Sequence, residues 1–292
     1  MNFSRCPILV FRLLPLLLLF LVGCHNSKLA YTPEDETTFR EKALLVKLEY
    51  EARGKKQSAW YFPPEKGTDA RPDPLVLVYP GINTRTLDWL WLATDCPRKE
   101  AGFLFIEYPG RGYSEGMMRP SKLGDNTSGA LDQLAEESGY SREALTDGVR
   151  LIGHSFGCGV ALQAAQQLEP RSIVLAAPFN TLRRAIWQTH GPLAWITPDN
   201  MDNRKYMRRL LKRLGPDVLQ VAIFHGEQDP LLPFRMGQEL ARVNPDRLLF
   251  YPISDGDHSN ILRQCQMEFY RLIFLDPNLP HTAELVTKQE SE

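Results

Sequence analysis

Six short apolar segments limit the folds that are open to this chain of 292 residues. They read PLVLVYPG from Pro74, GFLFIEYPG from Gly102, and then VRLIG, SIVLAAP, LQVAIFHG and RLLFYP. Each is almost continuously apolar, which is typical of a strand buried on both faces of a parallel sheet. Helical segments lie between them, so the pattern predicts an α/β fold with a mostly parallel central sheet and helices on both faces. Two earlier segments, VKLEYEA and QSAWYF, predict an antiparallel hairpin.

The predicted domain extends over residues 44–276, and 43% of the chain is hydrophobic, which is enough for one large core. Residues 179–218, between SIVLAAP and LQVAIFHG, are too many for an ordinary connection between elements. We therefore expect an insertion there, such as a lid. Residues 277–292 are polar and are expected to form a polar tail.

Two parts of this predicted lid carry apolar side chains. The first part could line an acyl pocket or simply pack the lid onto the domain, and its apolar residues are Ile186, Trp187, Leu193, Trp195 and Ile196. The second part, RKYMRRLLKRL from Arg204 to Leu214, has apolar residues at helical spacing opposite a basic face. Such a helix can lie on an anionic membrane, although a basic face is more often only solvated.

The first 24 residues have the composition of a signal sequence. Arg5 and Arg12 precede the apolar run LLPLLLLFLV, which is too short to span a bilayer comfortably. The run is followed by Gly23 and Cys24, and the ending Leu-Val-Gly-Cys resembles the lipobox of bacterial lipoproteins. The alternatives are an uncleaved anchor and an ordinary secretory signal.

The lipobox resemblance implies how this end of the chain is processed. It implies a signal peptide over residues 1–23, a lipid such as palmitate on Cys24, and a tether over residues 24–43. The protein would then be anchored in a membrane of the bacterial cell envelope, at the outer membrane or facing the periplasm.

Composition and spacing exclude several other classes of function. The formal charge is −1, so no nucleic-acid partner is expected. The chain has neither a CxxC pair nor an HExxH segment, and we expect no metal site and no cofactor. Loss of Cys6 and modification of Cys24 would leave three cysteines, which allow one disulfide at most.

The most informative motif is GHSFG, in which Gly153, Ser155 and Gly157 alternate between an apolar run and a helix-like one. Glycine is costly inside either element. At a turn between them, the glycines give the helix room to pass close to the strand, and the serine is held in a strained conformation with its Oγ above the edge of the sheet. Ligands of open parallel sheets bind at that edge, so Ser155 is a candidate nucleophile.

The GHSFG motif resembles the nucleophile elbow of the α/β-hydrolase superfamily, in which an acid and then a histidine follow the serine along the chain. The resemblance covers about residues 44–274 and implies an α/β-hydrolase fold. It also implies His258 as the general base, because this histidine follows the last strand-like segment. The other downstream histidines are less suitable, since His190 lies in the insertion, His225 ends a strand and His281 lies in the tail.

The segment HGEQDPLLPF resembles the acid loop of monoglyceride-lipase-like and thioesterase-like hydrolases. This resemblance implies Asp229 as the acid that orients His258. Asp229 also precedes a proline, so the alternative is a simple turn residue. Asp255 and Asp257 are nearer to His258 in sequence and compete for the role, but the segment SDGD favours local hydrogen bonds for their carboxylates.

An oxyanion hole needs two backbone N–H groups. The first is expected from Phe156, the residue after the serine. By resemblance the second comes from Ile82 in YPGINTRT, with Gly81 giving the backbone room. Here the sequence departs from the usual His-Gly, because Pro80 stands in the histidine position, which puts the support of this N–H in doubt.

These motifs together predict a serine hydrolase that cleaves a small-molecule carboxylic ester or thioester through an acyl-enzyme. One alternative is a catalytically silent, lipid-anchored binding protein on the same fold, because this fold hosts many functions. Another is a serine exopeptidase, although no acidic cluster indicates a site for a free amino terminus.

Overall fold

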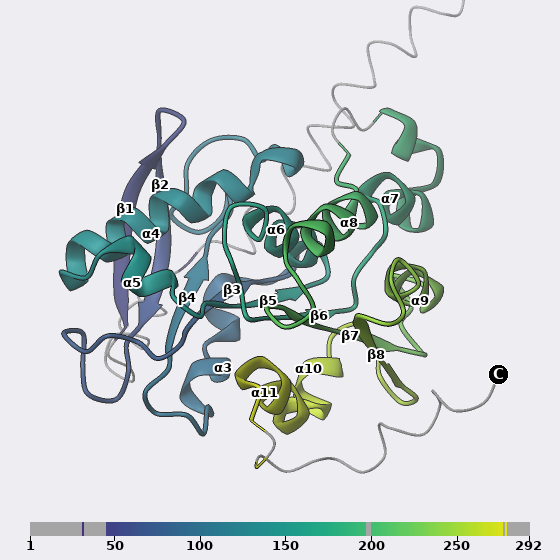
Figure 1. Ribbon diagram of the computed structural model, residues 1–292. Helices are drawn as coiled ribbons and strands as arrows, with labels where there is room; N and C mark the ends of the chain where they lie inside the picture. The colour runs from purple at the N-terminus through teal and green to yellow at the C-terminus, as the bar shows by residue number, and fades with distance from the viewer. Residues whose placement is uncertain (1–30, 32–44, 197–199, 277, 279–292) are drawn as a thin grey trace, which may run out of the picture.

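The computed structural model describes residues 31, 45–196, 200–276 and 278. The predicted signal peptide, with Cys24, lies outside these residues, as do all but Tyr31 of the predicted tether and all but Asn278 of the predicted tail. The described chain forms a sheet with helices on both sides (Figure 1). Its eight strands are β1 Val46–Ala52, β2 Lys55–Phe62, β3 Leu75–Tyr79, β4 Gly102–Ile106, β5 Arg150–His154, β6 Ser172–Ala176, β7 Gln220–Gly226 and β8 Leu248–Ile253.

The order of the strands places the candidate site at the middle of the sheet. The order is β1-β2-β4-β3-β5-β6-β7-β8, with antiparallel pairing of β1 with β2 and of β2 with β4 and parallel pairing elsewhere. The hairpin and the mostly parallel sheet predicted from the sequence are therefore confirmed. The chain leaves β3 on one side to form β4 and returns on the other side to form β5. The carboxyl ends of β3 and β5 thus make the switch point where open α/β sheets bind ligands.

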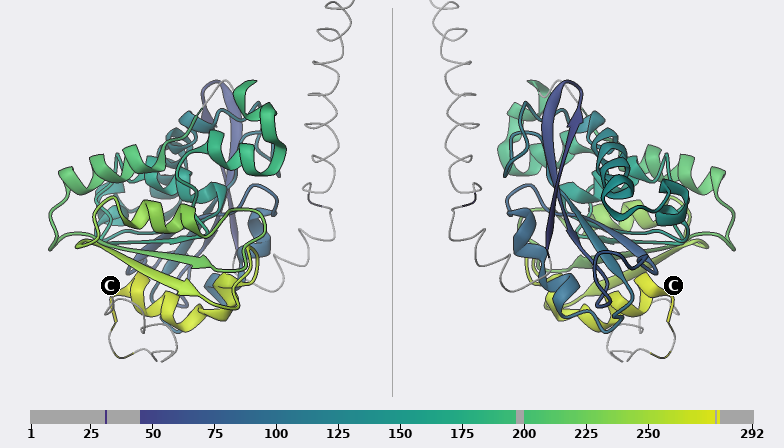
Figure 2. Two further views of the ribbon diagram at one scale, coloured as in Figure 1. Left: turned by 90° about the vertical axis from the view of Figure 1, so that its right-hand side faces the viewer. Right: turned by 90° about the vertical axis from the view of Figure 1, so that its left-hand side faces the viewer.

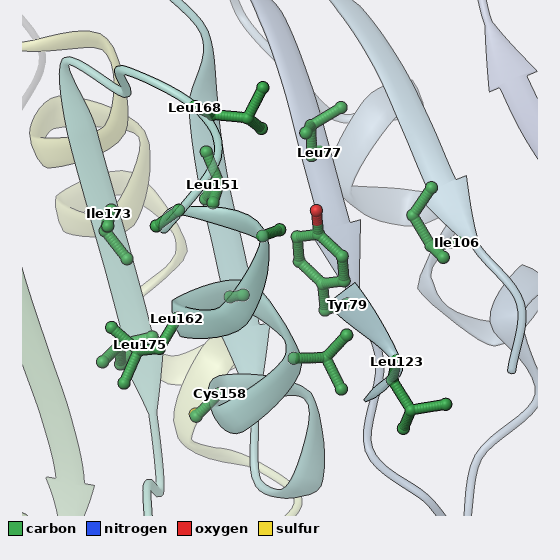
Figure 3. Close-up of a cluster of buried hydrophobic side chains, with 14 of the residues drawn as sticks. Leu77, Tyr79, Ile106, Leu123, Leu151, Cys158, Leu162, Leu168, Ile173 and Leu175 are labelled. Carbon is green, nitrogen blue, oxygen red and sulfur yellow. The ribbon is translucent and has the colours of Figure 1, made fainter. Parts of the chain in front are cut away.

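Alternating side chains of the strands divide the core into two clusters, one on each face of the sheet. In β3, Leu75, Leu77 and Tyr79 belong to the first cluster, whereas Val76 and Val78 belong to the second. Figure 3 shows part of the first cluster, with Tyr79 beside the helix that follows β5. Both clusters are buried, which explains why these strands read as continuous apolar runs.

Helices cover each cluster, and the two layers lie on opposite sides of the sheet (Figure 2). The first cluster takes side chains from α4 Gly124–Ser138, α5 Arg142–Thr146, α6 Phe156–Ala164, α7 Leu182–His190, α8 Asn203–Arg213 and α9 Arg235–Ala241. The second takes them from η2 Thr86–Trp89, α3 Trp91–Thr94, α10 Ile261–Gln264 and α11 Gln266–Phe274. Two short 3-10 helices, η3 Pro120–Lys122 and η4 Gly191–Ile196, lie in connections.

The predicted lid, residues 179–218, contains α7, η4 and α8. The apolar residues expected on one side of α8 are buried in the first cluster, among them Met207, Leu210 and Leu211, and α8 packs against α6. This half of the segment is therefore a layer of the domain, and its apolar side chains are not free to enter a membrane. The basic face of α8 is largely exposed, as a solvated face would be. None of the helices in the described chain is long and apolar enough to cross a membrane.

Tyr31 lies in an aromatic socket although it precedes the first strand. Its ring stacks on Tyr113 at 5.5 Å between centroids and meets Trp60 edge-on at 6.0 Å. Its hydroxyl accepts a hydrogen bond from the N–H of Leu87 at 3.3 Å. Because Trp60 is buried, these contacts fix one point of the predicted tether on the domain.

Candidate active site

Ser155 occupies a sharp turn between β5 and α6. Its φ of 52° and ψ of −117° lie in a region that non-glycine residues rarely adopt. The two glycines of the motif are required by close packing. A Cβ on Gly153 would lie 2.7 Å from the Cα of Cys158, and one on Gly157 would lie 1.9 Å from the carbonyl oxygen of Tyr79. The strained elbow expected from GHSFG is present, with its helix pressed against β3 and β5.

The structure brings Ser155, His258 and Asp229 together from three connections. Nδ1 of His258 lies 2.7 Å from Oδ2 of Asp229, and Nε2 lies 2.9 Å from Oγ of Ser155. Because an ionised carboxylate can only accept, Nδ1 carries the hydrogen and Nε2 is free to accept from the serine hydroxyl. The imidazole is therefore in the tautomer that a general base needs.

The Asp229 carboxylate is fully buried and held by its own loop. Oδ1 accepts hydrogen bonds from the N–H groups of Leu231 and Leu232, both at 2.9 Å. Burial acts to raise the pKa of Asp229, but the hydrogen bond and charge of His258 and these two backbone donors outweigh it and lower the pKa. The acid is thus kept ionised beside the histidine.

Asp257 and His225 make other hydrogen bonds, although Nε2 of His225 also lies 3.6 Å from Oδ2 of Asp229. Oδ1 of Asp257 accepts from the N–H groups of Ser259 and Asn260, both at 2.7 Å, which is the local bonding expected for this turn. Asp255 is exposed. His225 is buried and its Nε2 donates to the carbonyl of Leu232 at 2.9 Å.

The remaining two histidines do not compete either. His190 is exposed at the end of α7, where Nδ1 lies 2.6 Å from the hydroxyl of the neighbouring Thr189. His281 lies outside the described residues.

The two expected oxyanion donors have the free N–H groups that this role requires. In the part of the chain that the structure describes, neither the N–H of Phe156 nor that of Ile82 has a hydrogen-bond acceptor. Phe156 is the first residue of α6, so its N–H points out of the helix end. Ile82 follows β3 at the switch point and packs against the first cluster.

Tyr108 supplies the support that Pro80 puts in doubt. Its buried hydroxyl donates to the carbonyl of Pro80 at 2.7 Å, and its ring meets Phe156 edge-on at 5.7 Å. Tyr108 belongs to the YPGRGYSEG loop after β4, so one side chain contacts the segments that carry both candidate donors.

His154 is a site residue that sequence reasoning missed. Its Nε2 donates to the backbone carbonyl of His258 at 2.7 Å, and its ring lies 5.0 Å from that of His258. Burial, together with the nearby His258, lowers the pKa of His154 to about 4, so the ring is neutral at pH 7. Its position inside the motif was visible in the sequence, but its contact with a residue 104 positions away was not.

One cavity lies away from the candidate active site. A cavity of about 700 Å³ includes Gly148 and Arg171, which precede β5 and β6, so it lies at the opposite end of the strands from Ser155. Within the described chain no His, Cys, Asp or Glu cluster could hold a metal ion. Cys96, Cys158 and Cys265 are buried and unpaired.

The two tryptophans of the predicted lid are exposed. Trp187 and Trp195 are 44% and 71% exposed and meet edge-on at 6.2 Å, whereas Ile186 packs against the first cluster. Leu193 and Ile196 lie outside the residues whose side chains are described.

Comparison with known proteins supports the fold. No protein-family model matches the chain. An uncharacterized protein of Mycobacterium tuberculosis is 28% identical over 210 residues, which is 68% of this chain and 67% of that protein. The lysophosphatidylserine lipase ABHD12 of Xenopus tropicalis is 27% identical over 168 residues, so the match covers 49% of this chain and 39% of that lipase.

Solved structures agree over nearly the whole domain. An α/β hydrolase from Vibrio vulnificus has a TM-score of 0.65 and 16% identity, covering 91% of this chain and 94% of its own. An esterase from Pyrococcus furiosus has a TM-score of 0.57 and 16% identity, covering 84% and 94%. The chain therefore has the α/β-hydrolase fold, as its motifs predicted, and its relatives in fold and sequence include an esterase and a lipase.

Proposed function

We propose that the protein is a serine hydrolase that cleaves a small-molecule carboxylic ester or thioester through an acyl-enzyme. The observation that carries this proposal is the hydrogen-bonded chain from Asp229 through His258 to Ser155, with both links under 3 Å. A serine hydroxyl is a weak nucleophile and needs such an adjacent base. The esterase and lipase among the similar proteins support the same chemistry.

In the proposed reaction, Oγ of Ser155 attacks the substrate carbonyl while Nε2 of His258 takes the hydroxyl proton. The buried carboxylate of Asp229 stabilises the imidazolium that forms. The negative oxygen of the tetrahedral intermediate is bound by the N–H groups of Phe156 and Ile82. His258 then gives its proton to the leaving oxygen or sulfur, and water activated by the same histidine releases the acid and restores Ser155.

We also propose that the protein acts at a membrane of the bacterial cell envelope, held by a lipid on Cys24. The support for this is the Leu-Val-Gly-Cys ending of the apolar run. Because the ABHD12 relative is a lysophosphatidylserine lipase, lysophospholipids are a natural class of substrate to test beside simple esters and thioesters.

The test is labelling with a fluorophosphonate probe together with hydrolysis of esters, acyl thioesters, lysophospholipids and peptides with free amino termini. We expect Ser155→Ala to lose labelling and to lose about 10⁶-fold in turnover, as serine hydrolases without their nucleophile do. Ser259→Ala is a matched control, because this exposed serine lies next to His258 and its side chain is not part of the chain of hydrogen bonds.

Each outcome separates the alternatives. A folded wild-type protein that neither reacts with the probe nor hydrolyses any substrate would support the silent binding protein. Labelling that survives in Ser155→Ala would place the nucleophile elsewhere. Hydrolysis confined to peptides with a free amino terminus would favour the exopeptidase.

A further inference from the structure

The N–H of Ile82 belongs to the same planar peptide as the carbonyl of Gly81. In a trans peptide these two groups point in opposite directions, so whatever holds the carbonyl also aims the N–H. This peptide also lies directly against the nucleophile elbow. A Cβ on Gly81 would be 2.8 Å from Nδ1 of His154 and 3.7 Å from the Cβ of Ser155. A small rotation of the peptide would therefore move the donor relative to the reacting atoms.

One side chain holds the Gly81 carbonyl. The hydroxyl of Thr84 donates to this oxygen at 3.0 Å, whereas the backbone N–H of Thr84 approaches it only at 3.4 Å. The indole N–H of Trp89 in turn donates to Oγ1 of Thr84 at 2.8 Å. Since an indole nitrogen can only donate, the hydroxyl must accept there, and its single hydrogen is left for the Gly81 carbonyl. The directions of both hydrogen bonds, from Trp89 to Thr84 and from Thr84 to Gly81, are thus fixed.

Trp89, the first donor of these two hydrogen bonds, is itself held in place. Trp89 is buried in η2, and its ring lies 4.9 Å from that of His154, whose Nε2 holds the backbone of His258. The preceding peptide is fixed independently, because Tyr108 donates to the carbonyl of Pro80. The peptide that carries the Ile82 N–H therefore lies between two anchored groups, and Thr84 is the side chain that bonds it directly.

We propose that Thr84, held by Trp89, is a positioning residue that aims the N–H of Ile82 at the oxyanion. This inference rests on the proposed hydrolase function for its catalytic meaning, while the geometry of the peptide stands by itself. Thr84 acts through the Gly81–Ile82 peptide and is not itself a catalytic residue. Loss of one whole oxyanion donor costs about 10²- to 10³-fold in kcat, so a misdirected donor should cost about 10- to 100-fold.

The test compares Thr84→Val, which keeps the shape and removes the hydroxyl, with Thr84→Ser, which keeps the hydroxyl. On an ester that the wild type hydrolyses, Thr84→Val should lower kcat by about 10- to 100-fold with little change in KM, since the donor acts mainly in the transition state. It should weaken binding of a trifluoromethyl ketone, which mimics the tetrahedral intermediate, by a similar factor. Thr84→Ser should restore both values to near those of the wild type.

Controls separate this role from a general loss of stability. Thr94→Val at the end of α3 removes an exposed threonine hydroxyl that bonds only its neighbour Asp95, and it should leave kcat unchanged. Thermal melts of all variants check that they fold. An unchanged kcat in Thr84→Val, a loss confined to KM, or a Thr84→Ser variant as poor as Thr84→Val would overturn the proposal.

A second measurement needs no turnover and so separates failure of this inference from failure of the proposed function. A crystal structure of Thr84→Val should show the Gly81–Ile82 peptide rotated or in two orientations, and one of Thr84→Ser should show it unchanged. If the peptide stays fixed in Thr84→Val, the inference is wrong whatever the protein hydrolyses. If the wild type hydrolyses nothing while the peptide does rotate, only the proposed function fails.

Discussion

Replacing Asp229 with Asn gives the sharpest test of the acid in the site, because the change preserves shape and alters one hydrogen-bonding atom. Oδ1 faces the N–H groups of Leu231 and Leu232. The oxygen of the new amide must remain there, since its NH₂ group would leave two buried donors without an acceptor. The NH₂ group then faces Nδ1 of His258, where the carboxylate oxygen lay at 2.7 Å.

The magnitude follows from the tautomer that this contact enforces. Facing a donor, Nδ1 of His258 must give up its hydrogen, which moves to Nε2. Nε2 lies 2.9 Å from Oγ of Ser155, where it can then only donate and cannot take the serine proton. Ser-His-Asp enzymes lose about 10⁴-fold in kcat on this change, which corresponds to about 5.5 kcal/mol of transition-state stabilisation.

The assay is steady-state hydrolysis of whichever ester the wild type accepts, with fluorophosphonate labelling rates as a second readout. Asp257→Asn is the matched control, because Asp257 is adjacent to His258 in sequence but only accepts from local backbone N–H groups. We expect the control to lose much less activity than Asp229→Asn. A mild effect of Asp229→Asn combined with a crippling effect of Asp257→Asn would refute the assignment of the acid.

Three further changes test separate parts of the structure. Gly157→Ala should destabilise the protein by about 3 kcal/mol or more in urea unfolding, since its Cβ would lie 1.9 Å from the backbone oxygen of Tyr79. Gly215→Ala is the control and should not destabilise it, because open space surrounds that position. Equal unfolding midpoints for the two variants would contradict the packing argument. Burial raises the pKa of Glu107 from its usual 4.5 to about 7. Between these two pH values the folded state therefore binds more protons than the unfolded state. The free energy of unfolding should fall by roughly 3 kcal/mol as the pH rises through this range. Glu107→Gln should remove that fall, so thermal melts should show its stability rising relative to the wild type from pH 4.5 to 7, and a constant difference would count against the raised pKa. Cys24→Ser, expressed in a bacterial host, should release the protein from the membrane fraction, and unchanged retention would argue against the predicted lipid on this residue.

The parts of this molecule that depend on residues close together in the sequence could be predicted from it. Continuous apolar runs identified the parallel strands because both faces of the sheet are covered. Glycines around Ser155 identified the elbow because a Cβ at Gly153 or Gly157 collides with neighbouring backbone. The choice of Asp229 over Asp257 as the partner of His258 also agrees with the structure, because SDGD forms the local turn that its composition favours.

What the sequence did not reveal depends on contacts between distant segments. The bond of Tyr108 to Pro80 and that of His154 to His258 join loops that follow different strands, and no periodicity records such pairs. The sequence could not show which surface covers the apolar face of α8, for a related reason. An amphipathic pattern shows that one face of a helix is apolar, but it does not show whether α6 or a membrane covers that face.

The socket that holds Tyr31 has a consequence for where substrates can be reached. Seven residue steps separate Cys24 from Tyr31, and a fully extended chain of that length spans at most about 25 Å. With a lipid on Cys24, the domain would stay within that distance of the headgroups at the socket formed by Trp60, Leu87 and Tyr113. This distance is less than the roughly 30 Å thickness of a bilayer's hydrocarbon core. A free tether of twenty residues would let the domain sample a much larger volume. If Cys24 carries the proposed lipid, the docked tyrosine would keep the proposed hydrolase close to the surface of its own membrane leaflet.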